Sequence, residues 1–144
     1  MKNKIPHITE VVLRDGQQSL IATRMKTKDM IPALSKMDKV GFSSVEVWGG
    51  ATYDVCLRFL NEDPWERLKV FKKHFKNTQL QMLLRGKNLV GYKKYHDSVI
   101  ELFISNSIKK GINIFRIFDS LNDINNIKSS IEYVNNGGQN SQGT

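Results

Sequence analysis

The sequence predicts an α/β fold, namely a partial TIM (β/α)8 barrel made of about the first four βα units. Segments with strand character alternate with segments of helical periodicity, which is typical of a parallel sheet with crossover helices. The strands begin near Ile8, Ser44, Leu80 and Ile112, at intervals of 36, 36 and 32 residues. An open dinucleotide-binding sheet would carry a Gly-x-Gly-x-x-Gly turn, which this sequence lacks. Because a complete barrel needs about 250 residues, the 144 residues correspond to about half of one.

The first unit is predicted to contain a strand over residues 8–13 and a helix over residues 28–40. Arg14-Asp15-Gly16 ends the strand pattern. Thr27 predicts an N-cap, and apolar residues follow it at helical spacing until Gly41. One strand and one helix therefore precede the second strand.

The second unit begins with a strand over residues 44–48, which Gly49-Gly50 terminates. Its helix is predicted to begin at Asp63-Pro64-Trp65-Glu66 and to run to about His74. Asp63 is a suitable N-cap, Pro64 suits the first helical position, and Glu66 completes a capping box.

The last two units follow the same plan. Residues 80–84 predict the third strand, and the helix after it ends at Gly111. Residues 112–118 predict the fourth strand, followed by a helix over about 124–134 that gives way to a polar loop at 135–140.

Composition narrows the class of protein. Hydrophobic residues make up 40% of the chain and charged residues 25%, as in one ordinary globular domain. No apolar run is long enough to span a bilayer, and the basic start lacks the apolar core of a secretory signal. The single Cys56 cannot form an internal disulfide, so we expect a cytoplasmic protein. The net charge of +8 comes without a nucleic-acid-binding motif, so no nucleic-acid partner is expected.

Polar or glycine-rich groups follow all four predicted strands. Arg14 and Asp15 follow the first, residues 48–50 close the second, Arg85 follows the third and Asp119 the fourth. In a βα barrel the carboxyl ends of the strands face one mouth, where active sites lie. Any one polar residue can simply end a strand, but four in register favour a functional site.

Longer segments carry a family resemblance. Residues 13–18 (LRDGQQ) resemble the opening signature of metal-dependent barrel lyases and synthases that act on α-keto acids. Further matches lie in residues 18–25, 46–52, 61–68, 81–86, 88–92 and 114–122. Together these segments resemble the biotin-dependent carboxyltransferase domain shared by oxaloacetate decarboxylase α subunits, pyruvate carboxylase and transcarboxylase. Residues 54–60 look most like the decarboxylase α subunit or the separate B subunit of a split pyruvate carboxylase.

The resemblance implies a reaction and a set of cofactors. A carboxyl group would move between oxaloacetate/pyruvate and biotin, with biotin carried on a separate domain. Pyruvate must lose a methyl proton to form an enolate, and a divalent metal stabilises the developing charge. By resemblance, Asp15 is a ligand of that metal, which is zinc, manganese or cobalt. Its alternative role is to cap the next helix.

The resemblance also assigns substrate and proton-transfer residues. Arg85 is the anchor of the substrate carboxylate, for which a guanidinium offers two parallel hydrogen bonds. Gln18 hydrogen-bonds the substrate, and Asp54 and Tyr92 form a polar relay at the biotin. Arg14 either contacts substrate or pairs with Asp15 or Asp119 inside the mouth. Each of these side chains could instead stabilise a loop.

The match ends with residues 142–144, which correspond to the lead into a fifth strand. We therefore expect residues 1–144 to be the N-terminal half of a carboxyltransferase domain that lacks the C-terminal barrel half and the biotinyl domain. The lysine and His-x-His pair that complete the family's metal site are absent, and His7, His74 and His96 do not have the spacing to replace them. Such a chain is expected to be inactive alone, with exposed sheet edges.

The family further implies partners. They are a biotinyl carrier domain, membrane decarboxylase subunits that would hold the protein at the inner membrane, and further copies of the full-length chain. Two alternatives remain open at this point. The chain could be an interaction module completed by a separately encoded C-terminal half, or an acyl-CoA lyase or synthase of the wider barrel group.

Overall fold

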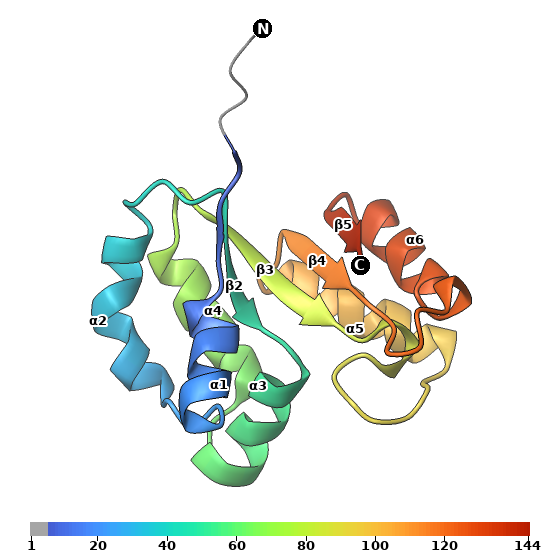
Figure 1. Ribbon diagram of the computed structural model, residues 1–144, viewed down its shortest axis with the longest axis horizontal. Coiled ribbons are helices and arrows are strands. Elements are labelled where there is room, and N and C mark those ends of the chain that lie inside the picture. The colour runs from blue at the N-terminus through green and yellow to red at the C-terminus, as the bar shows by residue number, and fades with distance from the viewer. Residues whose placement is uncertain (1–5) are drawn as a thin grey trace, which may run out of the picture.

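The computed structural model describes residues 6–144, which form an α/β fold around a parallel sheet of five strands (Figure 1). The strands are β1 (Thr9–Glu10), β2 (Ser44–Trp48), β3 (Gln79–Leu84), β4 (Ile114–Ile117) and β5 (Asn140–Gly143). The α-helices are α1 (Gln17–Ile21), α2 (Thr27–Met37), α3 (Gly50–Val55), α4 (Pro64–His74), α5 (Asp97–Lys109) and α6 (Lys128–Asn136). Shorter helical turns are η1 (Val12–Gly16), η2 (Cys56–Leu60), η3 (Gly86–Asn88) and η4 (Ile124–Asn126).

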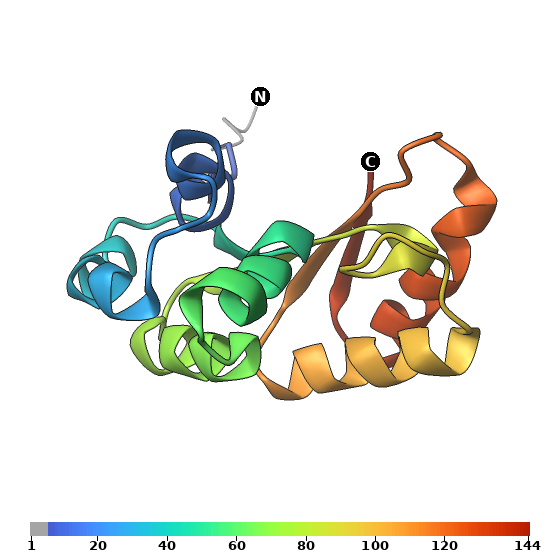
Figure 2. The same cartoon turned by 90° about the horizontal axis from the view of Figure 1, so that it is seen from below.

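The strands lie in their order along the chain, β1-β2-β3-β4-β5, and every neighbouring pair is parallel. A doubly wound sheet reverses its strand order at a switch point, and the described residues contain no such reversal. Figure 2 shows α2, α4, α5 and α6 arranged along one side of the sheet. The predicted alternation of parallel strands and helices is thus confirmed.

The first strand is shorter than predicted, and the prediction of a strand over residues 8–13 was wrong beyond Glu10. The Glu10 carboxylate accepts the backbone N–H groups of Val11 and Val12, both at 2.8 Å. The backbone N–H groups of residues 14–16 then all point to the Val11 carbonyl, at 2.8–3.2 Å. These bonds turn the chain into η1, which therefore carries Arg14 and Asp15.

The C-terminal segment also differs from its prediction. Residues 140–143 form β5, with Asn140 opposite Ile114 and Gly143 opposite Ile117 on β4. The sequence Asn-Ser-Gln-Gly has no strand propensity, so its conformation is imposed by the neighbouring strand. The last helix, α6, begins at Lys128 rather than Ile124, since residues 124–126 form the separate turn η4.

Helix starts were predicted with mixed success. Asp63 caps α4 as expected, because its carboxylate accepts the Trp65 N–H at 2.8 Å, with Pro64 at the first helical position. Glu66 pairs with Lys69 on the helix surface. The prediction of Thr27 as an N-cap was wrong: Thr27 is the first residue of α2, and its hydroxyl donates to Glu62 at 2.5 Å.

The two faces of the sheet differ in polarity. Side chains alternate along each strand, and one set packs against the helices in the core, as do Val45, Met82 and Phe115. A register shift after Glu46 places Trp48 opposite Met82, within an aromatic cluster that includes Trp65 from α4. The opposite set carries the polar residues Ser44, Glu46, Gln81 and Arg116 together with the apolar Leu83 and Ile114. No helix within residues 6–144 has the length and apolarity that crossing a bilayer requires.

Candidate functional site at the carboxyl ends of the strands

Parallel strands place their carboxyl ends at one edge of the sheet, and the predicted site residues follow these ends. Arg14 and Asp15 lie in η1 after β1, and Asp54 lies in α3 after β2. Arg85 directly follows β3, and Tyr92 lies in the loop beyond η3. Figure 2 looks onto this edge from below.

Arg14 is buried and paired with two carboxylates. Its Nε and Nη2 atoms both lie 2.6 Å from Oε1 of Glu46, a residue in β2. Its Nη1 donates to Oδ1 of Asp15 at 2.9 Å. Arg14 thus pairs with Asp15, which was one of its predicted roles. Its main partner is Glu46, a contact that was not predicted from the sequence.

Asp15 is the predicted metal ligand, and its side chain is 49% exposed beside Arg14. A catalytic zinc takes three protein ligands. Among residues 6–144 there is no group of three His, Cys, Asp or Glu side chains that could hold a metal ion. The described residues therefore offer one suitable carboxylate and do not by themselves fit a divalent metal.

Arg85 lies over the start of α3. Its Nη1 donates to the Gly91 carbonyl at 3.0 Å, and its guanidinium lies 4.9 Å from the centre of the Tyr92 ring. A Cβ atom on Gly50 would stand 2.9 Å from Cζ of Arg85 and 3.2 Å from the Val90 carbonyl oxygen. The glycine at this position is therefore what allows the guanidinium to lie against the backbone.

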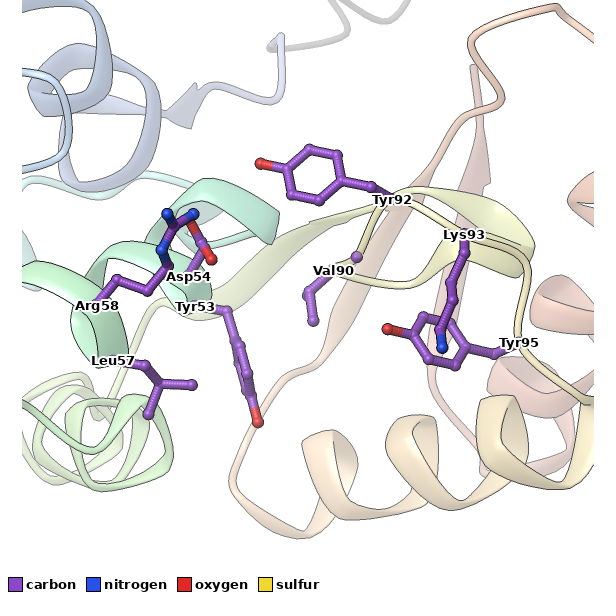
Figure 3. Close-up of a pocket in the computed structure, with 9 residues that line it drawn as sticks. Tyr53, Asp54, Leu57, Arg58, Val90, Tyr92, Lys93 and Tyr95 are labelled. Atoms are coloured by element: carbon purple, nitrogen blue, oxygen red, sulfur yellow. The ribbon is translucent and has the colours of Figure 1, made fainter.

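Asp54 and Tyr92 line the same cavity, of about 460 Å³, between α3 and the loop after η3 (Figure 3). The cavity is open, and its walls are mostly aromatic and aliphatic, with the charged groups Asp54, Arg58 and Lys93. Asp54 pairs with Arg58 one helical turn away, at 3.4 Å. Tyr92 is 76% exposed, and Figure 3 shows that it comes from a different segment of the chain than Asp54 and Arg58. The predicted relay residues thus share a cavity without a direct hydrogen bond between them in the described structure.

Arg85 and Tyr92 also share a smaller hollow of about 220 Å³ with Asp119 and Ser120, which follow β4. The pKa of the Asp119 carboxyl lies below its ordinary value, chiefly because the Asp123 N–H donates to it, as does the Leu121 N–H. Asp119 therefore caps its own loop.

Gln18 is half-buried in α1, and its neighbour Gln17 is the inward-facing glutamine. The Gln17 amide donates to the Leu13 carbonyl at 3.2 Å and accepts the Met25 N–H at 3.4 Å. Gln17 thus stabilises the loop. The predicted role of Gln18 in substrate binding is a proposal.

Cys56 is fully buried in η2, and burial raises the pKa of its thiol to about 11. Cys56 is therefore a packed core residue rather than a nucleophile.

The sequence analysis missed a polar cluster centred on Glu46. Glu46 accepts a hydrogen bond from Gln81 at 2.7 Å and one from Arg116 at 3.1 Å, besides its pair with Arg14. The available signal was the alternation of single polar residues with apolar ones inside the strands, as in Val-Glu-Val and Leu-Gln-Met. The predicted site residues follow strand ends, whereas Glu46, Gln81 and Arg116 lie within strands.

No family model matches the chain. It is 57% identical over 136 residues to the B subunit of pyruvate carboxylase from Methanocaldococcus jannaschii, a match that covers 94% of this chain and 24% of that protein. It is 53% identical over 137 residues to the methylmalonyl-CoA carboxyltransferase 5S subunit of Propionibacterium freudenreichii subsp. shermanii, covering 95% of this chain and 27% of that one.

Solved structures give the same result. The carboxyl transferase domain of Rhizobium etli pyruvate carboxylase, solved with pyruvate, superposes with a TM-score of 0.93 at 42% identity, covering 98% of this chain and 24% of that one. The same domain solved with oxamate and biotin gives a TM-score of 0.93 at 41% identity, covering 99% and 24%. The chain thus spans about a quarter of the length of these relatives, which are enzymes. Sequence and fold together make this chain a homologue, over the residues that it spans, of the carboxyltransferase domain of pyruvate carboxylases and related carboxyltransferases.

Proposed function

We propose that this chain forms part of the active site of a carboxyltransferase that moves a carboxyl group between oxaloacetate/pyruvate and biotin. The observation that supports this most directly is the placement of Arg85 against Gly50 and beside Tyr92, a residue that lines both the smaller hollow with Arg85 and the cavity with Asp54. Relatives solved with pyruvate, and with oxamate and biotin, support the same substrate class. The chain itself is proposed to be the N-terminal half of such a domain, in a partial (β/α)8 barrel.

Arg85 is the residue that we assign to the substrate carboxylate. One arm of its guanidinium donates to the Gly91 carbonyl, which fixes the plane of the group. The remaining N–H groups can donate in parallel to a carboxylate, a geometry that lysine does not reproduce. When oxaloacetate loses its carboxyl group, the electrons of the broken C–C bond pass to the keto oxygen as an enolate, and a nearby guanidinium stabilises that charge.

Tyr92 and Asp54 are proposed to form a polar relay that assists proton movement at the biotin. The exposed Tyr92 hydroxyl can reach a molecule in the cavity, and Asp54 lies on the facing wall with Arg58. The aromatic and aliphatic walls of this cavity fit the largely apolar ring system of biotin. When bound, biotin supplies the nitrogen atom that carries the carboxyl group.

Asp15 is proposed to be one ligand of a divalent metal, zinc, manganese or cobalt, whose other ligands come from outside the described residues. Residues 6–144 contain no group of three side chains that could ligate a metal, so the chain by itself is not proposed to hold one. Gln18 is proposed to hydrogen-bond the substrate and Arg14 to contact it or to orient Asp15. It follows that the chain is not expected to turn over substrate alone.

The branch of the family is a further proposal. The resemblance favours an oxaloacetate decarboxylase α subunit. Its proposed partners are a biotinyl carrier domain, membrane subunits and further copies of the full-length chain. The relative from Methanocaldococcus jannaschii supports the alternative of a separate carboxylase subunit. None of the relatives named above is an acyl-CoA lyase, so that alternative has no support from them.

Pyruvate binding tests the proposal. Arg85→Lys is expected to weaken pyruvate binding about tenfold or more, because lysine loses the paired donors. The measurement is a titration of the purified chain with pyruvate, followed by NMR chemical shifts. Arg58→Lys is the matched control, since Arg58 lines the cavity from the exposed side of η2. Equal binding by the Arg85→Lys and Arg58→Lys variants would contradict the assignment.

A further inference from the structure

Glu46 is a fully buried carboxylate that the proposed function does not use. It lies in β2, and its side chain is 0% exposed. A carboxylate removed from water is unstable unless opposite charges and hydrogen bonds compensate it. Arg14 supplies two nitrogen atoms at 2.6 Å, and Gln81 adds a hydrogen bond at 2.7 Å.

Arg116 completes the cluster from β4, two strands away from β2. Its Nη2 donates to Oε1 of Glu46 at 3.1 Å, and its Nε lies 3.1 Å from Oε2. The pair reaches over β3, where Gln81 also contacts the same carboxylate. One side chain therefore joins η1, β2, β3 and β4 on the polar face of the sheet.

This arrangement fixes the direction of Arg14. A guanidinium is planar, so holding its Nε and Nη2 on one carboxylate also determines where its Nη1 points. In this structure Nη1 points at Asp15, 2.9 Å away. The buried Glu46 thus decides how Arg14 meets Asp15 at the carboxyl end of the sheet.

We propose that Glu46 is a positioning residue, which holds Arg14 on Asp15 and orients Arg116 on the polar face. The inference rests on the proposed function in so far as that function assigns Arg14 and Asp15 to the active site. A purely structural carboxylate would stabilise the sheet, and its removal would leave the orientation of Arg14 unchanged.

Arginine side-chain NMR on the full chain tests this. The exchange of the Arg14 Nε–H with solvent is expected to be about tenfold or more slower than that of the exposed Arg58, because a buried, paired N–H is protected. In Glu46→Gln, which keeps the shape and removes the charge, the Nε signals of Arg14 and Arg116 shift, and the Arg14 protection falls about tenfold. Asp38→Asn, which removes a buried carboxylate elsewhere, leaves both signals in place.

Two results would overturn the proposal. One is unchanged Arg14 and Arg116 signals in a folded Glu46→Gln variant. The other is an Arg14 Nε–H that exchanges with solvent as fast as the Arg58 Nε–H in the wild-type chain. This comparison does not require the Glu46→Gln variant to fold. Pyruvate titration of the same samples tests the proposed function separately: a failure to bind pyruvate contradicts that function, whereas the arginine signals decide the role of Glu46.

Discussion

At the scale of single residues, the candidate site depends on a glycine, Gly50, that leaves room for the Arg85 side chain. Gly50 begins α3 directly under the Arg85 guanidinium, and no other residue type fits without contact below 3.0 Å. Arg85 in turn bonds the Gly91 carbonyl and faces the Tyr92 ring. The placement of the proposed substrate anchor thus depends on a residue that has no side chain to contribute.

Gly50→Ala is therefore expected to displace Arg85 and to weaken pyruvate binding about tenfold, while the midpoint of urea unfolding changes little. The flexible end of Arg85 can move away from the new methyl group at modest energetic cost. Gly143→Ala is the control, because its Cβ would meet Ile127 at an ordinary 3.6 Å. A Gly50→Ala chain with unchanged pyruvate affinity would show that the position of Arg85 does not matter for binding.

Cys56 gives a second prediction at this scale. Its burial and its raised pKa of about 11 leave very little thiolate near neutral pH. Ellman's reagent is expected to react about a hundredfold more slowly with the folded chain than with the chain in urea. Equal rates in the two conditions would show that the thiol is accessible and refute its assignment to the core.

At the scale of elements, Asp38 joins the end of α2 to the turn before β3. Its buried carboxylate accepts the backbone N–H groups of Lys76, Asn77 and Thr78 at about 3 Å. Burial alone would raise the pKa of this carboxyl, but the three backbone hydrogen bonds outweigh it and lower the pKa. A charge-assisted contact of this kind stabilises the folded state as long as the group is ionised.

Asp38→Asn is expected to lower the free energy of unfolding by about 2 kcal/mol near neutral pH. Because the folded-state pKa is depressed, the contribution of Asp38 is present above the unfolded value, near 3.8, and is lost as the pH falls through the lower folded value. The difference between wild type and variant should thus narrow below about pH 4. Urea unfolding curves measured across this range check the prediction, with the exposed Glu132→Gln as control. A difference that stays constant with pH would refute it.

At the scale of the whole molecule, the sheet has two edges within the described residues. In that part of the chain β1 pairs only with β2, and β5 pairs only with β4. Leu20 of α1 and Leu121 in the loop after β4 are both exposed. Completion of the barrel by a separate C-terminal half, which the sequence analysis left open, remains a prediction.

The chain alone is expected to hold less than about one-tenth equivalent of zinc or manganese after equilibrium dialysis, because one carboxylate cannot replace the usual three ligands. Metal content measured by mass spectrometry checks this, together with the rate of oxaloacetate decay. Stoichiometric metal that disappears in Asp15→Asn would show instead that the described residues suffice for a metal site.

The alternation of parallel strands and helices, the capped start of α4 and the family could all be predicted from the sequence, because these depend on local periodicity and on short contiguous motifs. The strand pattern also predicted that Arg14, Asp15, Arg85 and Asp119 share one edge, since residues after parallel strands meet there, whereas Asp54 and Tyr92 were predicted only from the family resemblance.

Only the tertiary structure decided the turn at Arg14 and Asp15, the strand at Asn140–Gly143 and the cluster around Glu46. Each depends on partners far along the chain or on the satisfaction of backbone N–H groups. The Glu46–Arg116 contact alone joins residues 70 positions apart, and no local pattern specifies which buried charge meets which.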